Sequence, residues 1–190
     1  MTDTATNPNI LPSNIPVPQD DGATRHLTGM MLPDLALPAT SDAPVNLSKL
    51  KGRVVVYVYP RTGVPGQHNP DGWDQIPGAR GCTPQSCSFR DHYGELKQFG
   101  VTQLFGLSTQ DTAYQREVAE RLHLPFPVLS DEKLQLTKAM RLPTFVAAGM
   151  TLIKRMAWVI DDGKITKVFY PVFPPDKNAK EVLNWLRTSR

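Results

Sequence analysis

The chain has only two cysteines and no long hydrophobic run, and both scarcities limit what it can be. Two cysteines among 190 residues are too few for the disulfide framework of a small secreted protein. No apolar run approaches the ~18 residues that a membrane span requires. Residues 1–26 also lack the cationic start and apolar core of a signal peptide. These absences predict a protein without a membrane partner, in a reducing compartment such as the cytoplasm.

The chain also has no large excess of positive or negative charge. The 21 Lys and Arg residues against 18 Asp and Glu residues give a formal net charge of only +3. The basic residues are scattered and form no block interleaved with aromatic residues, so we expect no nucleic acid partner. The histidines are far apart and have no metal-ligand spacing with the cysteines: His26, His68, His92 and His123. The sequence therefore indicates no metal site and no cofactor.

The pattern of apolar and turn residues predicts an α/β fold. Residues 1–27, which are rich in Pro, Asn, Asp and Thr and contain no aromatic residue, are expected to be a flexible or surface-hugging extension. Residues 28–190 are expected to form one domain. Its elements are predicted as a preliminary hairpin and short helix in 30–52, strands at 53–60, 102–108 and 126–130, helices at 83–100, 111–124, 131–140 and 176–189, and a hairpin of 152–161 with 165–172. This order predicts a mixed central sheet flanked by helices, which is the order of the thioredoxin fold.

Residues 61–81 interrupt this alternation. The segment is rich in Gly and Pro and is predicted to be loop throughout. At this length it exceeds the usual connection between two elements, and such loops are commonly functional or mobile.

Both cysteines lie in the stretch "GCTPQSCSFRD", residues 81–91. A metal pair, a structural staple, a redox pair and a pair without function are all open at this point. Cys82 precedes the predicted helix, with Thr83 as the expected N-cap. The unpaired N–H groups and positive dipole of a helix start favour a thiolate. Gly81 is expected to leave room for a small substrate to reach the sulfur, so this is where a nucleophilic cysteine would be placed.

The spacing of the two cysteines limits how they can react together. Five helical residues rotate the chain by a net angle of about 140° and advance it by about 7.5 Å. A disulfide requires Cα atoms within about 7 Å, so Cys82 and Cys87 cannot be joined while the first turn is helical. Ser86 and Ser88 give this turn a poor helix propensity. The spacing thus suggests attack by one cysteine, local unwinding, and resolution by the other.

Three stretches in register resemble a known family. "YVYPRTG…PGARGCTPQSCSFRD", "GLSTQDTAYQREVAERLHLPFPVLSD" (106–131) and "KRMAWVIDDGKITKV" (154–168) resemble the peroxiredoxins, and most of all their bacterioferritin-comigratory or PrxQ branch. The resemblance covers residues 30 to 187.

The resemblance implies a role for individual residues. Cys82 falls on the peroxidatic cysteine, which becomes a sulfenic acid, and Cys87 on the resolving cysteine, which forms an intramolecular disulfide with it. Arg155 falls on the arginine that holds the thiolate and polarises the peroxide. Pro60 falls on the proline that shields the site, and with Gly81 and Thr83 it is expected to line the peroxide. The implied substrates are hydrogen peroxide and organic hydroperoxides, the implied reductant is thioredoxin or a similar dithiol protein, and the implied state is a monomer or weak dimer.

One departure from the family pattern lies before the nucleophile. Pro60 and Cys82 are separated by the long segment 61–81, and Ala79 has no hydroxyl where the family has Thr or Ser three residues before the cysteine. Thr62, Thr83 or a backbone group is expected to replace that hydroxyl. The inserted segment is either a lid or partner-docking loop, or a tolerated surface loop.

Other functions remain alternatives. The same fold serves thiol–disulfide exchange proteins and redox sensors, although no C-x-x-C motif is present, and it also serves binding domains without activity. A Cys-His hydrolase is disfavoured because no histidine is placed to serve Cys82. The plainer interpretations are that the cysteines are core residues, that Arg155 is a surface salt-bridge partner, and that Thr83 is only a cap.

Overall fold

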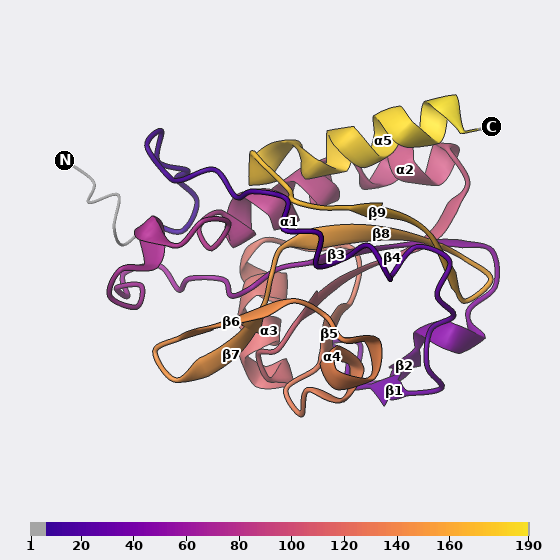
Figure 1. Cartoon of the computed structure of the whole chain (residues 1–190), viewed down its shortest axis with the longest axis horizontal. Helices are drawn as coiled ribbons and strands as arrows, with labels where there is room; N and C mark the ends of the chain where they lie inside the picture. Colours follow the sequence, from indigo (N-terminus) through magenta and orange to yellow (C-terminus); the bar gives the residue numbers. More distant parts are fainter. Residues whose placement is uncertain (1–6, 190) are drawn as a thin grey trace.

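A computed structural model of the chain describes residues 7–189, and its centre is a five-stranded mixed sheet (Figure 1). The strand order is β5-β4-β3-β8-β9. Its members are β3 (Arg53–Val58), β4 (Val101–Ser108), β5 (Val128–Ser130), β8 (Met156–Asp161) and β9 (Lys164–Phe169). The first three run parallel to one another, whereas β8 pairs antiparallel with both β3 and β9. The predicted thioredoxin-like class, with helices around a mixed sheet, is confirmed.

The central strand β3 is buried on both faces because its side chains alternate between two cores. Val54, Val56 and Val58 belong to one apolar cluster, to which the N-terminal residue Leu27 also contributes. Val55, Tyr57 and Tyr59 belong to the cluster on the other face. This double burial explains why the sequence of β3 is an almost unbroken run of β-branched and aromatic residues.

Helices cover the sheet (Figure 1). Helices α1 (Cys82–Asp91), α2 (Tyr93–Gln98) and α5 (Asn178–Thr188) supply Phe89, Leu96 and Leu183 to the cluster around Tyr57. Helix α4 (Gln135–Met140) supplies Leu136 to the opposite cluster, and α3 (Thr112–Arg121) packs against β5. Within residues 7–189 no helix is both long enough and apolar enough to cross a bilayer.

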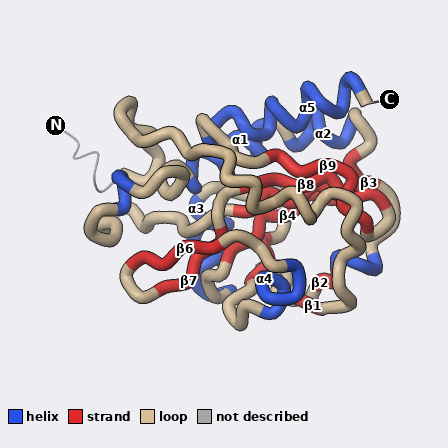
Figure 2. Tube along the Cα trace, viewed as in Figure 1, coloured by secondary structure: helices blue, strands red, loops and turns tan. Residues whose placement is uncertain are grey.

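The N-terminal segment lies along this domain as irregular chain and turns (Figure 2). Leu27 is fully buried in the core, and His26 Nε2 lies 2.8 Å from the carbonyl oxygen of Met140. The expected hairpin and short helix follow, as β1 (Ala36–Leu37), β2 (Val45–Asn46) and the 3-10 helix η1 (Leu47–Lys49). Residues 1–6 of the expected extension lie outside the described residues, and the domain boundary after residue 27 stays a prediction.

Three predicted segments differ from the structure in their detail. The predicted helix 83–100 breaks at His92, whose ring Nδ1 lies 2.8 Å from the carbonyl oxygen of Ser88. The predicted helix 176–189 begins with a 3-10 turn, η3 (Pro175–Lys177). The segment 61–81, predicted to be loop throughout, contains the 3-10 helix η2 (Trp73–Gln75).

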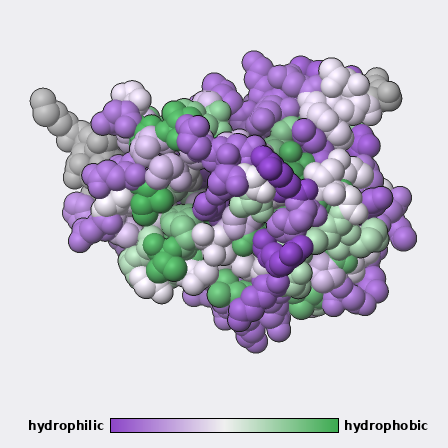
Figure 3. Space-filling model, in the orientation of Figure 1, coloured by the Kyte–Doolittle hydropathy of each residue, from purple (hydrophilic) through white to green (hydrophobic). Residues whose placement is uncertain are grey.

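The predicted strand 152–161 is wrong as one element. Its first part, β7 (Met150–Ile153), pairs with β6 (Thr144–Ala147) in a separate hairpin that the sequence pattern did not predict. Ala148 and Gly149 both have positive φ, at 48° and 73°, which suits a two-residue hairpin turn. Hydrophobic side chains gather over this hairpin (Figure 3), where Val146 is 69% exposed. Residues 154–155 are left between β7 and β8.

Replacing Leu27 by Ala tests whether the end of the N-terminal segment belongs to the fold. We expect Leu27→Ala to lower the free energy of unfolding by about 2–5 kcal/mol, because it opens a cavity in a closed core. Met31→Ala is the control, since Met31 is 59% exposed and its truncation should change stability by no more than about 0.5 kcal/mol. Urea denaturation of both variants measures the difference, and equal midpoints would contradict the expectation.

Candidate active site

The first residue of α1 is Cys82, one residue before the predicted helix start. The N-cap is Gly81, which has a φ of 104° and makes no side-chain capping bond. Thr83 therefore lies inside the first turn, and its expected role as the N-cap is wrong. The earlier start places the Cys82 sulfur at the positive end of the helix, as the sequence suggested.

Two donors converge on the sulfur of Cys82, which is only 3% exposed. The backbone N–H of Arg61 lies 3.4 Å from Sγ, and Nη2 of Arg155 lies 3.2 Å from it. The carbonyl oxygen of Ala79 lies 3.5 Å away and can accept only from a protonated thiol. A thiolate accepts hydrogen bonds and donates none, so the two donors suit the deprotonated sulfur.

The guanidinium of Arg155 is held on several sides. Its Nη2 lies 3.0–3.1 Å from the carbonyl oxygens of three consecutive residues, Gly78, Ala79 and Arg80. Its Nη1 donates to Oε1 of Gln85. Arg155 is 3% exposed and lies between β7 and β8, so the interpretation of this residue as a surface salt-bridge partner in a strand is wrong.

Gln85 and Asn178 complete this network, and sequence reasoning missed both. Gln85 Nε2 donates to Oδ1 of Asn178, at the start of α5, over 2.9 Å, and both residues are buried. Gln85 follows Cys82 by three residues on one helix, so its place on the same helix face was a signal that could have revealed it. No local pattern marks Asn178, because its contact depends on how α5 docks.

The hydroxyl candidates differ in their surroundings. Pro60 is buried and directly precedes Arg61, whose N–H faces the sulfur. The hydroxyl of Thr62 is 3.5 Å from Oε1 of Gln110, which also accepts from the Thr62 N–H. The hydroxyl of Thr83 is buried and has no hydrogen-bond partner among the described residues. Of the two hydroxyls, that of Thr83 is free to bind an added oxygen.

The space beside Gly81 is already filled. A Cβ at this position would lie 2.7 Å from Cγ of Pro175 and 2.9 Å from Cδ1 of Leu11. The absence of a side chain thus permits close packing of the N-terminal segment and η3 on the start of α1. The structure gives Gly81 this packing role, and its expected contact with substrate stays a prediction.

The second cysteine lies apart from the first. Cys87 is half-buried on α1, and both thiols are free. Burial raises the pKa of the Cys87 thiol, and the carboxylate of Asp91 raises it further, while Arg90 and Arg121 act in the opposite direction. The thiol of Cys87 is therefore largely protonated near neutral pH, and the continuous helix between the cysteines keeps the sulfurs apart.

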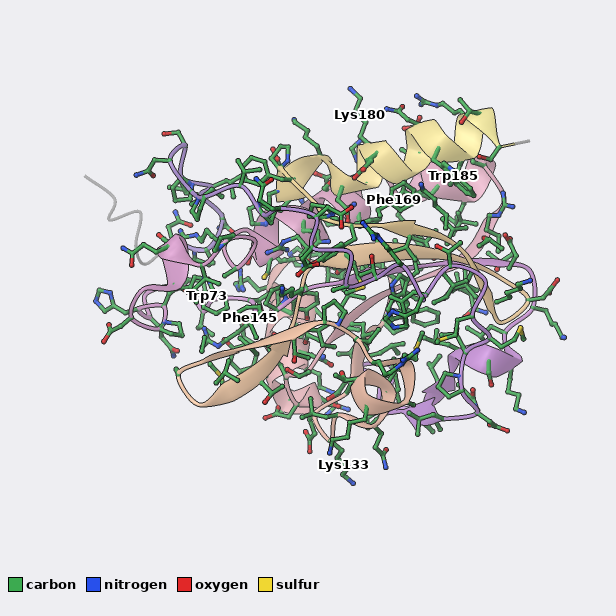
Figure 4. All side chains as sticks on the ribbon, viewed as in Figure 1. Trp73, Lys133, Phe145, Phe169, Lys180 and Trp185 are labelled. Carbon is green, nitrogen blue, oxygen red and sulfur yellow. The ribbon has the colours of Figure 1, made fainter. Side chains whose placement is uncertain are left out.

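The inserted segment 61–81 is built into the protein. Trp73 is buried with Ala79 and Leu152, and its ring centroid lies 6.2 Å from that of Phe145 (Figure 4). Buried Arg80 pairs with Asp74 at 3.0 Å and also donates to the carbonyl oxygens of Asn7 and Ile10. These contacts do not fit a merely tolerated surface loop.

In the described part of the chain, no three or more His, Cys, Asp or Glu side chains are grouped to hold a metal.

Comparison with known proteins agrees with this geometry. A model of the Redoxin family matches residues 27–183. The chain is 32% identical over 184 residues to peroxiredoxin Q, chloroplastic, of Oryza sativa subsp. japonica, covering 93% of this chain and 76% of the relative. It is 35% identical over 164 residues to peroxiredoxin Bcp of Escherichia coli, covering 84% of this chain and 94% of the relative. The crystal structure of peroxidoxin BcpB from Mycobacterium tuberculosis superposes with a TM-score of 0.68 at 29% identity, covering 86% and 97% of the two chains.

The raised pKa of Cys87 gives a pH-dependent prediction. In a Cys82→Ser variant Cys87 is the single thiol, and we expect iodoacetamide to alkylate it along a pH profile whose midpoint lies above that of the same variant in denaturant. The sign follows because the thiolate reacts and burial delays its formation. Asp91→Asn should move the folded midpoint down, since it removes a charge that raises the pKa. A folded midpoint at or below the denatured one would contradict the expectation.

Gly81 gives a second prediction, with a matched control in α2. Gly81→Ala should lower the free energy of unfolding by about 2–4 kcal/mol, because it combines a positive φ with contacts below 3 Å. Gly94→Ala should be neutral or stabilising, since a Cβ there meets nothing within 4 Å. Thermal and urea unfolding of the two variants measure this contrast, and equal effects would show that the start of α1 is loosely packed.

Proposed function

The chain belongs to the peroxiredoxins, the thiol peroxidases of the Redoxin family, and from this premise we propose that Cys82 is its peroxidatic residue, Cys87 its resolving residue and Arg155 its activating cation. The observation that carries the proposal is the pair of donors, from Arg155 and the Arg61 backbone, that meet at the sulfur of Cys82.

The first chemical step follows from this arrangement. The Cys82 thiolate attacks one peroxide oxygen, the O–O bond breaks, and the second oxygen leaves with a proton as water or an alcohol. The sulfur is oxidised to a sulfenic acid and the peroxide is reduced. Arg155 stabilises negative charge first on the sulfur and then on the leaving oxygen, and its fixed position means that little reorganisation is needed. Thr83 is the side chain that we assign to hydrogen-bond the bound peroxide, because its hydroxyl is buried and unpaired.

The second step joins the two cysteines. The Cys87 sulfur attacks the sulfenic sulfur, water leaves, and a disulfide forms. The helical geometry requires the first turn of α1 to unwind. The contacts that would open include the hydrogen bond from the Gln85 N–H to the Gly81 carbonyl (3.0 Å) and the bonds from Gln85 to Arg155 and Asn178. The two neutral bonds each contribute about 1 kcal/mol net and the bond from the Arg155 guanidinium about 1.5–3 kcal/mol, so the unwinding has to overcome several kcal/mol of local stability.

Reduction of the disulfide completes the cycle. Peroxiredoxins need a peroxide and a thiol reductant, and for this chain we assign a dithiol protein such as thioredoxin, which reduces a disulfide by exchange. A monomer or weak dimer and a cytoplasmic location are further parts of the proposal. Family membership does not favour the alternative of a thiol–disulfide exchange protein or redox sensor without efficient peroxidase activity.

Intact mass and thiol counting before and after one equivalent of hydrogen peroxide test the assignment. We expect the parent to lose both thiols and two hydrogen atoms while it remains a single chain. Cys87→Ser should lose one thiol and gain one oxygen, because its sulfenic acid has no partner. Cys82→Ser should keep its thiol unchanged.

The three results separate the roles of the cysteines. A sulfenic adduct on Cys82 in the parent, with Cys87 still free, would remove Cys87 as the resolving residue. Unchanged thiols in the parent after excess peroxide would contradict the peroxidase assignment itself. Oxidation of Cys87 in the Cys82→Ser variant at the parent rate would show that the roles are reversed.

A further inference from the structure

Asn178, the first residue of α5, belongs to a row of hydrogen bonds that begins at the reacting sulfur. Nη2 of Arg155 lies 3.2 Å from Sγ of Cys82, and Nη1 of Arg155 donates to Oε1 of Gln85. Nε2 of Gln85 in turn donates to Oδ1 of Asn178 over 2.9 Å. A single side chain therefore separates Asn178 from the cation at the sulfur.

The guanidinium fixes the direction of these hydrogen bonds. An arginine side chain only donates, so the group of Gln85 that faces Arg155 has to be the carbonyl oxygen of its amide. The NH2 group of Gln85 therefore points the other way, and it cannot reach water because Gln85 is fully buried. Nearly all buried donors in proteins are paired, and Oδ1 of Asn178 is the acceptor that pairs this one.

The amide of Asn178 is oriented for the same reason. Its oxygen faces Gln85, so its NH2 group points along α5, where Nδ2 donates to Oε2 of Glu181 over 3.3 Å. Every hydrogen bond from Arg155 onwards thus runs away from the sulfur, and the row ends at a carboxylate. Reversing either amide would place two donors or two acceptors face to face, so each amide holds the next in one orientation.

Contacts away from the site hold Asn178 in its position. Val182 of α5 is fully buried in the core, and the ring of Trp185 meets the ring of Phe169 edge-on with centroids 6.3 Å apart (Figure 4). A side chain on a packed helix is positioned more precisely than one on a loop. The docking of α5 on the sheet therefore sets where the acceptor for Gln85 lies.

We propose that Asn178 is a positioning residue of the peroxidase reaction: by accepting from Gln85 it keeps the Gln85 oxygen on Arg155, and it thereby holds the guanidinium against the reacting sulfur. The inference rests on the proposed function and adds a residue whose effect on the sulfur passes through two other side chains. A donor stabilises developing negative charge best when it is already in place. Without an acceptor at position 178, the Gln85 amide has no single preferred orientation, and Nη1 of Arg155 loses its fixed contact.

Asn178→Leu removes the acceptor while it keeps a side chain of similar size. The first step is measured in the Cys87→Ser protein, where the sulfenic acid has no partner, by rapid mixing with hydrogen peroxide, quenching with a thiol reagent and intact mass. We expect Asn178→Leu to lower the second-order rate constant for oxidation of Cys82 by roughly tenfold, as for a weakened hydrogen bond to a charged group. Urea unfolding of each variant checks that it is folded under the assay conditions.

Two controls on the same helix separate positioning from stability. Asn184→Leu makes the same change at an exposed asparagine of α5, and it should leave the rate constant unchanged. Val182→Ala opens a cavity under α5 and lowers the stability of the protein, but it keeps the amide of Asn178, so the rate constant should again be unchanged. An equal loss of rate in Val182→Ala and Asn178→Leu would show that only the docking of α5 matters, and this result would overturn the proposal.

A double variant tests the direction of the hydrogen bonds. Asn178→Asp offers Gln85 an acceptor but places a second carboxylate beside Glu181, and Glu181→Gln turns that neighbour into a donor. The protein with both changes keeps both contacts of position 178, so we expect it to regain most of the rate that Asn178→Leu loses.

The results of these variants and of the peroxidase assignment can be told apart. An unchanged rate constant in Asn178→Leu, or a loss that the double variant does not restore, would overturn the proposal and leave the peroxidase assignment intact. If hydrogen peroxide fails to oxidise Cys82 in the Cys87→Ser protein without further changes, the proposed function fails, and this inference fails with it.

Discussion

The active-site end of this protein depends on the buried guanidinium of Arg155. Burying a cation costs several kcal/mol unless its donors are satisfied, and here Nη1 and Nη2 contact Gln85, the sulfur of Cys82 and the carbonyl oxygens of three consecutive residues at the end of the segment 61–81. The inserted segment therefore supplies part of the solvation that water would otherwise give. Because these groups come from α1, from the chain between β7 and β8, and from the insertion, the position of the cation fixes their relative placement.

The hydrogen bonds with Arg155 require the end of the inserted segment to adopt one conformation. The carbonyl oxygens of Gly78, Ala79 and Arg80 can point at Arg155 only if this part of the chain is held in one conformation. The buried side chain of Arg80 holds it, because it pairs with Asp74 and donates to the carbonyl oxygens of Asn7 and Ile10. The N-terminal segment thus supports the insertion, which supports Arg155, which contacts Cys82. A change in residues 7–10 is therefore connected to the sulfur through three sets of hydrogen bonds, without touching it.

Local sequence patterns predicted the fold class and drew attention to Cys82, because the run in β3 and the glycine and cysteine at the start of α1 are each visible within a few residues. Arg155 was identified only through the resemblance to a family. The β6–β7 hairpin was missed because residues 141–151 were assigned no element, and the turn at Ala148 and Gly149 lacks the Asn-Gly or Asp-Gly pair that marks a two-residue hairpin turn. The bond between Gln85 and Asn178 joins α1 to α5 across 93 positions, and the contact of Leu11 with Gly81 is equally remote. No local pattern encodes contacts of this kind.

The same packing that positions Cys82 opposes its pairing with Cys87. Serine-rich composition makes the first turn of α1 intrinsically weak, which led the sequence to suggest easy unwinding. In the folded chain, however, that turn is buried, Gly81 is enclosed by Leu11 and Pro175, and Ser86 accepts a hydrogen bond from the hydroxyl of Tyr57 (3.1 Å). Tertiary contacts therefore stabilise what propensity does not. In the proposed reaction, oxidation of Cys82 converts a thiolate into a sulfenic acid, and the attraction between the negative sulfur and the guanidinium of Arg155, whose Nη2 lies 3.2 Å away, is lost. The first step would therefore remove one of the interactions that hold the start of α1, which lowers the cost of the unwinding that the second step requires.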